Sequence, residues 1–75
     1  MGWIAYRLGR NQEALEFLAR AWELDRNPEI AAHLGEVLWA SGQKEDARGI
    51  WQEGAEIDAT NYVLVETLER RGVEL

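Results

Sequence analysis

Residues 2–25 and residues 35–58 are two copies of one unit, offset by 33 positions. Five pairs are identical: Gly2 and Gly35, Gly9 and Gly42, Ala14 and Ala47, Glu23 and Glu56, Asp25 and Asp58. Conservative exchanges, such as Tyr6 for Trp39 and Phe17 for Ile50, fill positions between them. A fixed period of this length is the signature of a stacked repeat. Because stacked repeats contact only their neighbours, we expect an exposed contact surface rather than an enclosed reaction centre.

The charge balance argues against nucleic acid as a partner. The chain has 8 Lys and Arg against 14 Asp and Glu, which gives a net charge of −6. A phosphate backbone is bound through a basic face, and here only Arg70 and Arg71 are adjacent. No apolar run approaches the ~20 residues of a membrane span, so we expect no membrane contact by this chain itself. The absence of Cys leaves no disulfide, thiolate metal site or thiol nucleophile.

Apolar residues recur at helical spacing throughout, and nothing has the alternation of a strand. The pattern predicts five helices in an antiparallel all-α array, with breaks near Gly9, Arg26, Gly42 and Ala59. Glycine closes a helix well because it adopts the left-handed conformation, so Gly9, Gly42 and Gly72 are the predicted stops. The predicted N-caps are Asn11, Asn27 and either Thr60 or Asn61. We expect close helix packing at Gly49 and Gly54, and inward-facing side chains at Phe17, Leu24, Trp51 and Ile57.

These features divide the chain into a truncated first repeat (1–26), a complete repeat (27–59) and a capping helix (60–72). Leu34, Gly35, Leu38, Gly42, Ala47, Trp51 and Gly54 have the spacing of the tetratricopeptide repeat, and Gly2, Gly9, Ala14, Leu18 and Ala21 repeat it. The chain therefore resembles that family, which implies an α-solenoid fragment of helix-turn-helix units. It departs from the family at Arg26 and Ala59, where a proline is usual, and at Ala31, where an aromatic residue is usual.

A narrower likeness concerns the runs GWIAYRLGR and NPEIAAHLGEVLWASGQ. They are similar to the C-terminal repeats of proteobacterial tetratricopeptide lipoproteins, which resemble an outer-membrane adaptor for a carboxy-terminal processing protease. This likeness implies a periplasmic scaffold with a membrane-anchored parent; a cytoplasmic location is the alternative. We also expect the opening helix of the first repeat to begin upstream of Met1, as at the C-terminal end of a longer array.

In such repeats the first helix of each pair lines the concave face. The resemblance therefore predicts a partner-binding groove formed by Trp3, Tyr6, Arg7, Glu29, Ala32, His33, Glu36, Trp39 and Tyr62. Ala32, Glu36 and Trp39 share one helix face by their spacing. The aromatic rings are candidate anchors for a partner; the alternative is that they pack against neighbouring helices. Glu29 and Glu36 favour a neutral or basic partner segment.

Nothing in the sequence indicates catalysis. His33 is the sole His, and no Ser, Cys or Lys has an evident relation to it that would form a nucleophile–base pair. No metal-ligand spacing is present, and we expect no cofactor. The paired acids Glu45 and Asp46 are explained by the dipole at the start of a helix. Trp22 and Trp51 are expected in the core.

We therefore expect a non-enzymatic scaffold or adaptor that binds a protein or peptide through its concave groove. The alternative is a homo-oligomerisation module in which Ile4, Leu15 and Leu18 at the exposed repeat edge bury themselves against a second copy.

Overall fold

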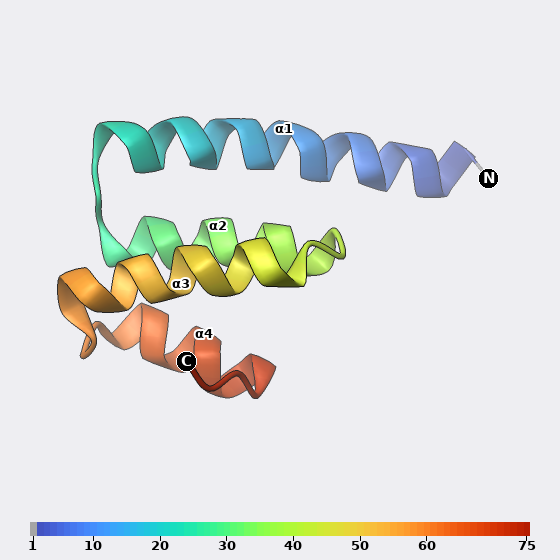
Figure 1. Cartoon of the computed structure of the whole chain (residues 1–75). Helices are drawn as coiled ribbons and strands as arrows, with labels where there is room; N and C mark the ends of the chain where they lie inside the picture. The colour runs from blue at the N-terminus through green and yellow to red at the C-terminus, as the bar shows by residue number, and fades with distance from the viewer. Residues whose placement is uncertain (1) are drawn as a thin grey trace.

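The computed structural model describes the backbone of residues 2–75 and the side chains of residues 12–75. This part of the chain forms four α-helices and no strand: α1 (Gly2–Leu24), α2 (Pro28–Ala40), α3 (Lys44–Asp58) and α4 (Tyr62–Arg71). Consecutive helices run antiparallel and are joined by short loops (Figure 1). The all-α helix-turn-helix array is as predicted, but the number of helices is four rather than five.

The prediction of a break at Gly9 is wrong, because α1 continues through Gly9 and Asn11 to Leu24. A glycine within a helix costs only about 1 kcal/mol relative to alanine, so Gly9 permits a break without enforcing one. At the matching position Gly42, by contrast, φ is +86° and the helix ends. There Gly42 N donates to Trp39 O and Gln43 N donates to Leu38 O, at 3.1 and 2.9 Å. These two bonds satisfy the carbonyl groups at the end of α2 and turn the chain back.

The starts of α2 and α4 follow the predicted capping residues. Asn27 Oδ1 accepts a hydrogen bond of 2.8 Å from Glu29 N, and Pro28 occupies the first turn of α2. A proline there loses nothing, because its missing N–H would have had no partner within the helix. Asn61, not Thr60, caps α4, since Asn61 Oδ1 accepts from Leu64 N at 3.2 Å.

The ends of α3 and α4 are closed by different means. Asp58 Oδ1 accepts from both the N–H and the hydroxyl of Thr60, at 3.0 and 2.7 Å, and these bonds lower the pKa of the Asp58 carboxyl below 3.8. At the end of α4, Gly72 has φ +67°. Gly72 N donates to Glu69 O and Val73 N donates to Leu68 O, the pattern that places a residue after the turn against the last helical turn. Val73 is accordingly buried.

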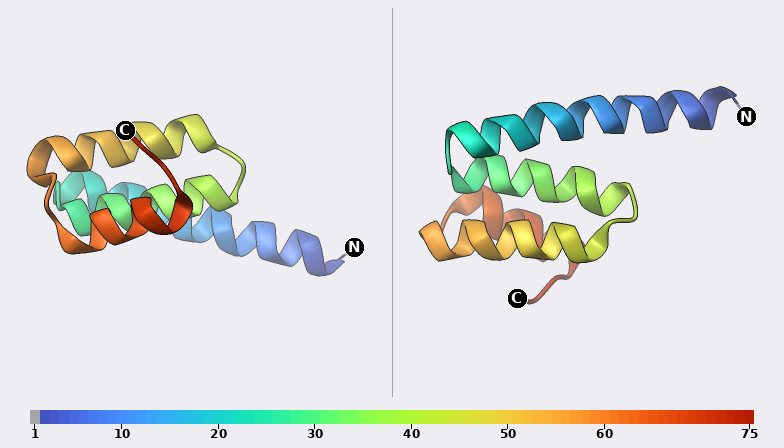
Figure 2. Two further views of the ribbon diagram at one scale, coloured as in Figure 1. Left: turned by 90° about the horizontal axis from the view of Figure 1, so that it is seen from below. Right: turned by 45° about the horizontal axis from the view of Figure 1, so that its top comes forward.

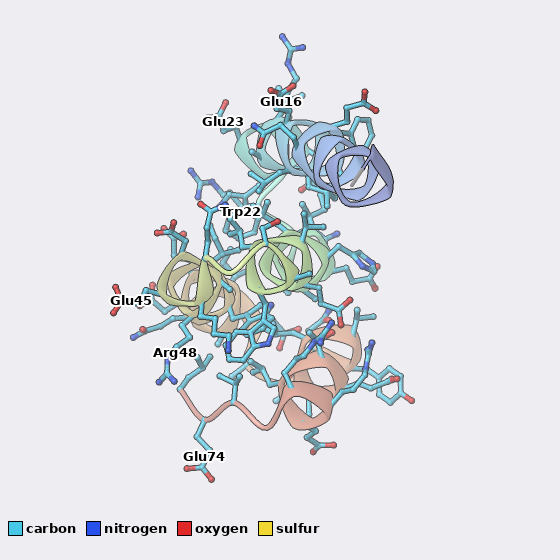
Figure 3. All side chains as sticks on the ribbon, turned by 90° about the vertical axis from the view of Figure 1, so that its right-hand side faces the viewer. Glu16, Trp22, Glu23, Glu45, Arg48 and Glu74 are labelled. Carbon is cyan, nitrogen blue, oxygen red and sulfur yellow. The ribbon has the colours of Figure 1, made fainter. Side chains whose placement is uncertain are left out.

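Helix α2 is the centre of the molecule and packs against α1, α3 and α4. In the end-on view of Figure 3, α1 lies above α2, α3 lies to the left of α2, and α4 lies below it. Trp51 of α3 is fully buried, and its indole N–H donates to the carbonyl of Ala32 at 3.3 Å. A Cβ at Gly35 would overlap the Trp51 ring, so this glycine admits the ring against α2. Trp22 and Trp51 are both in the core, as predicted.

Three apolar residues predicted to face inward are exposed instead. Phe17, Leu24 and Ile57 are 73%, 83% and 50% exposed, because the described part of the chain provides no helix to cover the outer faces of α1 and α3. The prediction for the two α3 glycines is half right. A Cβ at Gly54 would lie 2.8 Å from that of Ala31, whereas a Cβ at Gly49 would meet nothing within 4 Å.

Candidate functional site

A groove of about 410 Å³ runs between α1 and α4, with α2 as its floor. His33, Glu36, Val37 and Ala40 contribute from α2, and their spacing of three and four residues places them on one helix face. Leu18 of α1 and Arg71 of α4 complete the lining. The other faces of α2 pack against the neighbouring helices, so this face is the one that remains open to the groove. The groove therefore combines apolar surface with a few polar and charged groups, as binding sites generally do.

Glu36 is held by an ion pair rather than left free. Its Oε1 lies 2.9 Å from an Nη of Arg70 on α4. The oxygen is buried, and no donor in the described chain meets the alignment of a hydrogen bond with it, so charge alone holds the pair. Because the Arg70 side chain is 56% exposed, such a contact contributes at most about 1 kcal/mol to stability. The larger effect of the ion pair is on the charge of the groove, because the guanidinium of Arg70 compensates the negative charge of Glu36.

Ala32 and Trp39 were predicted to line the groove, but neither residue lines it. Ala32 is fully buried, and the prediction that its side chain is exposed is wrong because α2 is packed against three neighbouring helices. Trp39 is half-buried, with its ring centroid 5.6 Å from that of Trp51 and tilted by 33°. Lys44 Nζ lies 5.0 Å from the Trp39 ring centroid. Trp39 therefore contacts the core, and the alternative of packing describes it better than a free groove anchor.

The remaining predicted groove residues divide into two sets. Glu29 and Tyr62 are exposed at the starts of α2 and α4 but do not line the groove. The neighbouring carboxylate of Glu66 raises the pKa of the Tyr62 phenol above its ordinary value. The side chains of Trp3, Tyr6 and Arg7 lie outside the described residues, so their contribution to partner binding stays a prediction.

The structure also changes the expected charge of the groove. Because Glu36 is paired with Arg70 and Glu29 lies elsewhere, the argument for a basic partner at this groove does not hold. Arg71 was not among the predicted residues, yet it lines the groove. The available signal was the adjacent pair Arg70 and Arg71 in the last turn of a helix, a position where the helix dipole also favours cations. Arg71 is the unpaired cation at the margin among the side chains that the structure describes.

No cluster of three or more His, Cys, Asp or Glu suited to a metal ion is present in the described chain. None of the helices in that same part is both long enough and apolar enough to cross a membrane.

The antiparallel helices, the repeated unit and the glycine–tryptophan contact between α2 and α3 define a stacked helical-repeat protein. A family model described as tetratricopeptide repeat matches residues 5–71. The chain therefore belongs to the tetratricopeptide-repeat family, whose members generally mediate protein–protein interactions and are not catalysts. Comparison with curated proteins found no match, and comparison with solved structures found none either.

Proposed function

We propose that this chain is an adaptor module that binds a segment of a protein partner in the groove between α1 and α4. The observation that supports it is the groove itself, in which three helices combine apolar surface from Leu18, Val37 and Ala40 with the guanidinium of Arg71. Arginine recognises carboxylates through paired hydrogen bonds. The expected segment therefore offers one or two apolar side chains and an acidic group.

The scale of the groove suits a short segment. About 410 Å³ lies within the range of concave sites that enclose small ligands or a few side chains. The resulting interface is small, and small interfaces are typical of weak, reversible contacts. A scaffold with several such repeats would gain affinity by engaging a partner at more than one site.

The test is an array of short peptides probed with the labelled chain, followed by titration of the selected peptides. Arg71→Gln should weaken their binding by about tenfold, since a hydrogen bond to a charged group contributes ~1.5–3 kcal/mol. Arg20→Gln is the matched control, because Arg20 is exposed on α1 and does not line the groove. Equal binding by both variants would place the site elsewhere. Selected peptides without acidic residues would contradict the role of Arg71.

Self-association is the second candidate function, and a specific feature favours it. Phe17 and Leu24 are strongly exposed and lie seven residues apart, which places them on one face of α1. Leu15 and Leu18, which were expected to form this edge, are half-buried and line grooves instead. The candidate surface is therefore the outer face of α1, defined by Phe17 and Leu24.

The adaptor's parent and location follow only from the narrower sequence likeness. A membrane-anchored parent would carry these repeats in the periplasm, where a processing protease could be recruited. Detection of the chain's parent in a periplasmic fraction would support this origin, and recovery in the cytoplasm would contradict it.

A further inference from the structure

A second groove, on the other side of α2, has no role in the function proposed above. It has a volume of about 500 Å³ and lies between α1 and α3. Its apolar surface comes from all three helices: Leu15, Ala19, Leu34, Leu38 and Ile50. Within the described residues no Cα of α1 lies within 8 Å of a Cα of α3, and the two ribbons are separated by α2 (Figure 2). Helix α1 therefore leaves this side of α2 partly open.

Gly49 on the wall of this groove has no explanation within the chain. Glycine weakens a helix interior, and Gly54, five residues later in α3, is explained by its close approach to Ala31. A Cβ at Gly49 would meet nothing within 4 Å, and its φ is not in the left-handed region. A residue with a side chain would therefore be accommodated here in the free chain. What glycine provides at an open wall is room for a second backbone to approach closely.

The margin of the groove is acidic. Glu45, Asp46 and Glu53 of α3 line it, and none has a cationic partner within 4.0 Å among the described side chains. The two cations nearest in sequence are engaged elsewhere. Lys44 lies over the ring of Trp39, and Arg48 donates to the carbonyl of Glu74 at 3.0 Å. Figure 3 shows Arg48 directed toward Glu74 and away from Glu45.

We propose that the groove between α1 and α3 binds a helical segment of a protein partner whose apolar stripe is flanked by Lys and Arg. The apolar floor takes the stripe, the acidic margin pairs with the cations, and Gly49 admits the partner's backbone. A helix fits because the described chain has no strand edge on which an extended peptide could add, and helices bind to grooves through anchors three and four residues apart.

A second copy of this chain is the less suitable occupant. A two-fold interface brings each patch against itself, so Glu45, Asp46 and Glu53 would meet their own counterparts. The chain as a whole has 14 acidic and 8 basic residues. A basic partner therefore complements the negative charge of the groove, whereas a second copy of this acidic chain would be repelled by it.

The experiment uses the full chain and a synthetic amphipathic peptide of about 14 residues, which spans ~21 Å as a helix. Leu forms the apolar stripe of the peptide and Lys flanks it; a twin peptide carries Glu in place of Lys. Binding is measured by fluorescence titration, with circular dichroism on the same samples. The wild-type chain should bind the Lys peptide, with an affinity that falls as salt is added, and should not bind the Glu twin.

Two variants separate binding in the groove from general attraction to an acidic protein. Gly49→Leu fills the groove without changing the charge, and it should weaken binding of the Lys peptide by about tenfold or more by introducing a clash. Gln52→Leu is the matched control, because Gln52 is exposed on α3 and does not line the groove. It should bind as wild type does, and Arg71→Gln should also leave this binding unchanged.

Three results would overturn the proposal. Equal weakening, or none, in Gly49→Leu and Gln52→Leu would show that the peptide is held by charge outside the groove. Binding of the Glu twin as tightly as the Lys peptide would remove the role of the acidic margin. A chain that dimerises in the absence of peptide, and whose dimer is lost in Gly49→Leu, would identify a second copy as the occupant.

Discussion

Adding one methyl group at Gly35 should destabilise this protein, whereas adding the same group at Gly49 should stabilise it. Both glycines lie within helices of the α2–α3 hairpin and neither has a positive φ. Gly35 is buried and Gly49 is exposed, so the two sites differ in what a Cβ would meet. At Gly35 it overlaps the ring of Trp51, and at Gly49 it meets nothing within 4 Å. Alanine therefore tests the packing at one site and only the helix propensity at the other.

The Trp51 ring has little room to move away from a methyl group at position 35. The ring is fully buried, its N–H donates to Ala32 O, and the Trp39 ring packs against it. Overpacking costs roughly 1–3 kcal/mol, and a lost buried hydrogen bond costs about 1–3 kcal/mol. The higher helix propensity of alanine relative to glycine offsets about 1 kcal/mol of these costs. We therefore expect Gly35→Ala to lower the free energy of unfolding by about 3 kcal/mol, a large fraction of the ~4–11 kcal/mol typical of a chain this size.

Gly49→Ala has only the propensity effect. We expect a gain of about 1 kcal/mol, which corresponds to a rise in Tm of ~4–8 °C for a domain of this size. Urea unfolding followed by far-UV circular dichroism measures both variants under one set of conditions. The packing argument is refuted if both substitutions shift the free energy of unfolding in the same direction. It is also refuted if Gly35→Ala remains within about 0.5 kcal/mol of wild type, the usual scale of a neutral surface change.

Two further predictions concern the core and the outer face of α1. Trp51→Ala should lower the free energy of unfolding by about 3–5 kcal/mol, the usual cost of deleting a large buried aromatic residue; melting within a few degrees of wild type would show that Trp51 is not central to the core. If the outer face of α1 mediates self-association, light scattering should show a dimer that a Phe17→Glu, Leu24→Glu double variant converts to a monomer. A wild-type chain that stays monomeric as its concentration rises would remove this second candidate function.

The turns that could be predicted are those where local chemistry alone determines the conformation. Asn27 before Pro28 favours a helix start, because the Asn side chain caps the first turn and the proline ring is preorganised for the first helical position. Gly42 and Gly72 end helices through backbone bonds to the preceding turn. Gly9 matches Gly42 in the repeat, yet α1 continues through it. Whether a helix ends at a glycine depends on the free energy that the chain gains by turning back, and that gain comes from tertiary packing.

The face of α2 that lines the groove between α1 and α4 is rotated by about one residue from the predicted face. Apolar and small residues occupy most of the run from Ile30 to Leu38, so helical spacing alone allows several orientations. Burial selects among them: Ala32 is fully buried, and the adjacent position His33 lines the groove. An all-round apolar helix is the case in which periodicity carries least information. The contribution of Arg71 could not be predicted either, because it depends on where the end of α4 lies relative to α2.

Both grooves have the same physical origin in the packing of α1. In the described chain α1 contacts α2 and no other helix, so a space remains on each side of that contact, one toward α3 and one toward α4. Leu15 lines the space toward α3, and Leu18 lines the space toward α4. The margins are opposite in charge, with Arg71 at one groove and Glu45, Asp46 and Glu53 at the other. If both proposed sites bind, one repeat would hold an acidic segment in the groove toward α4 and a basic segment in the groove toward α3 at once. That arrangement is suited to an adaptor that connects partners.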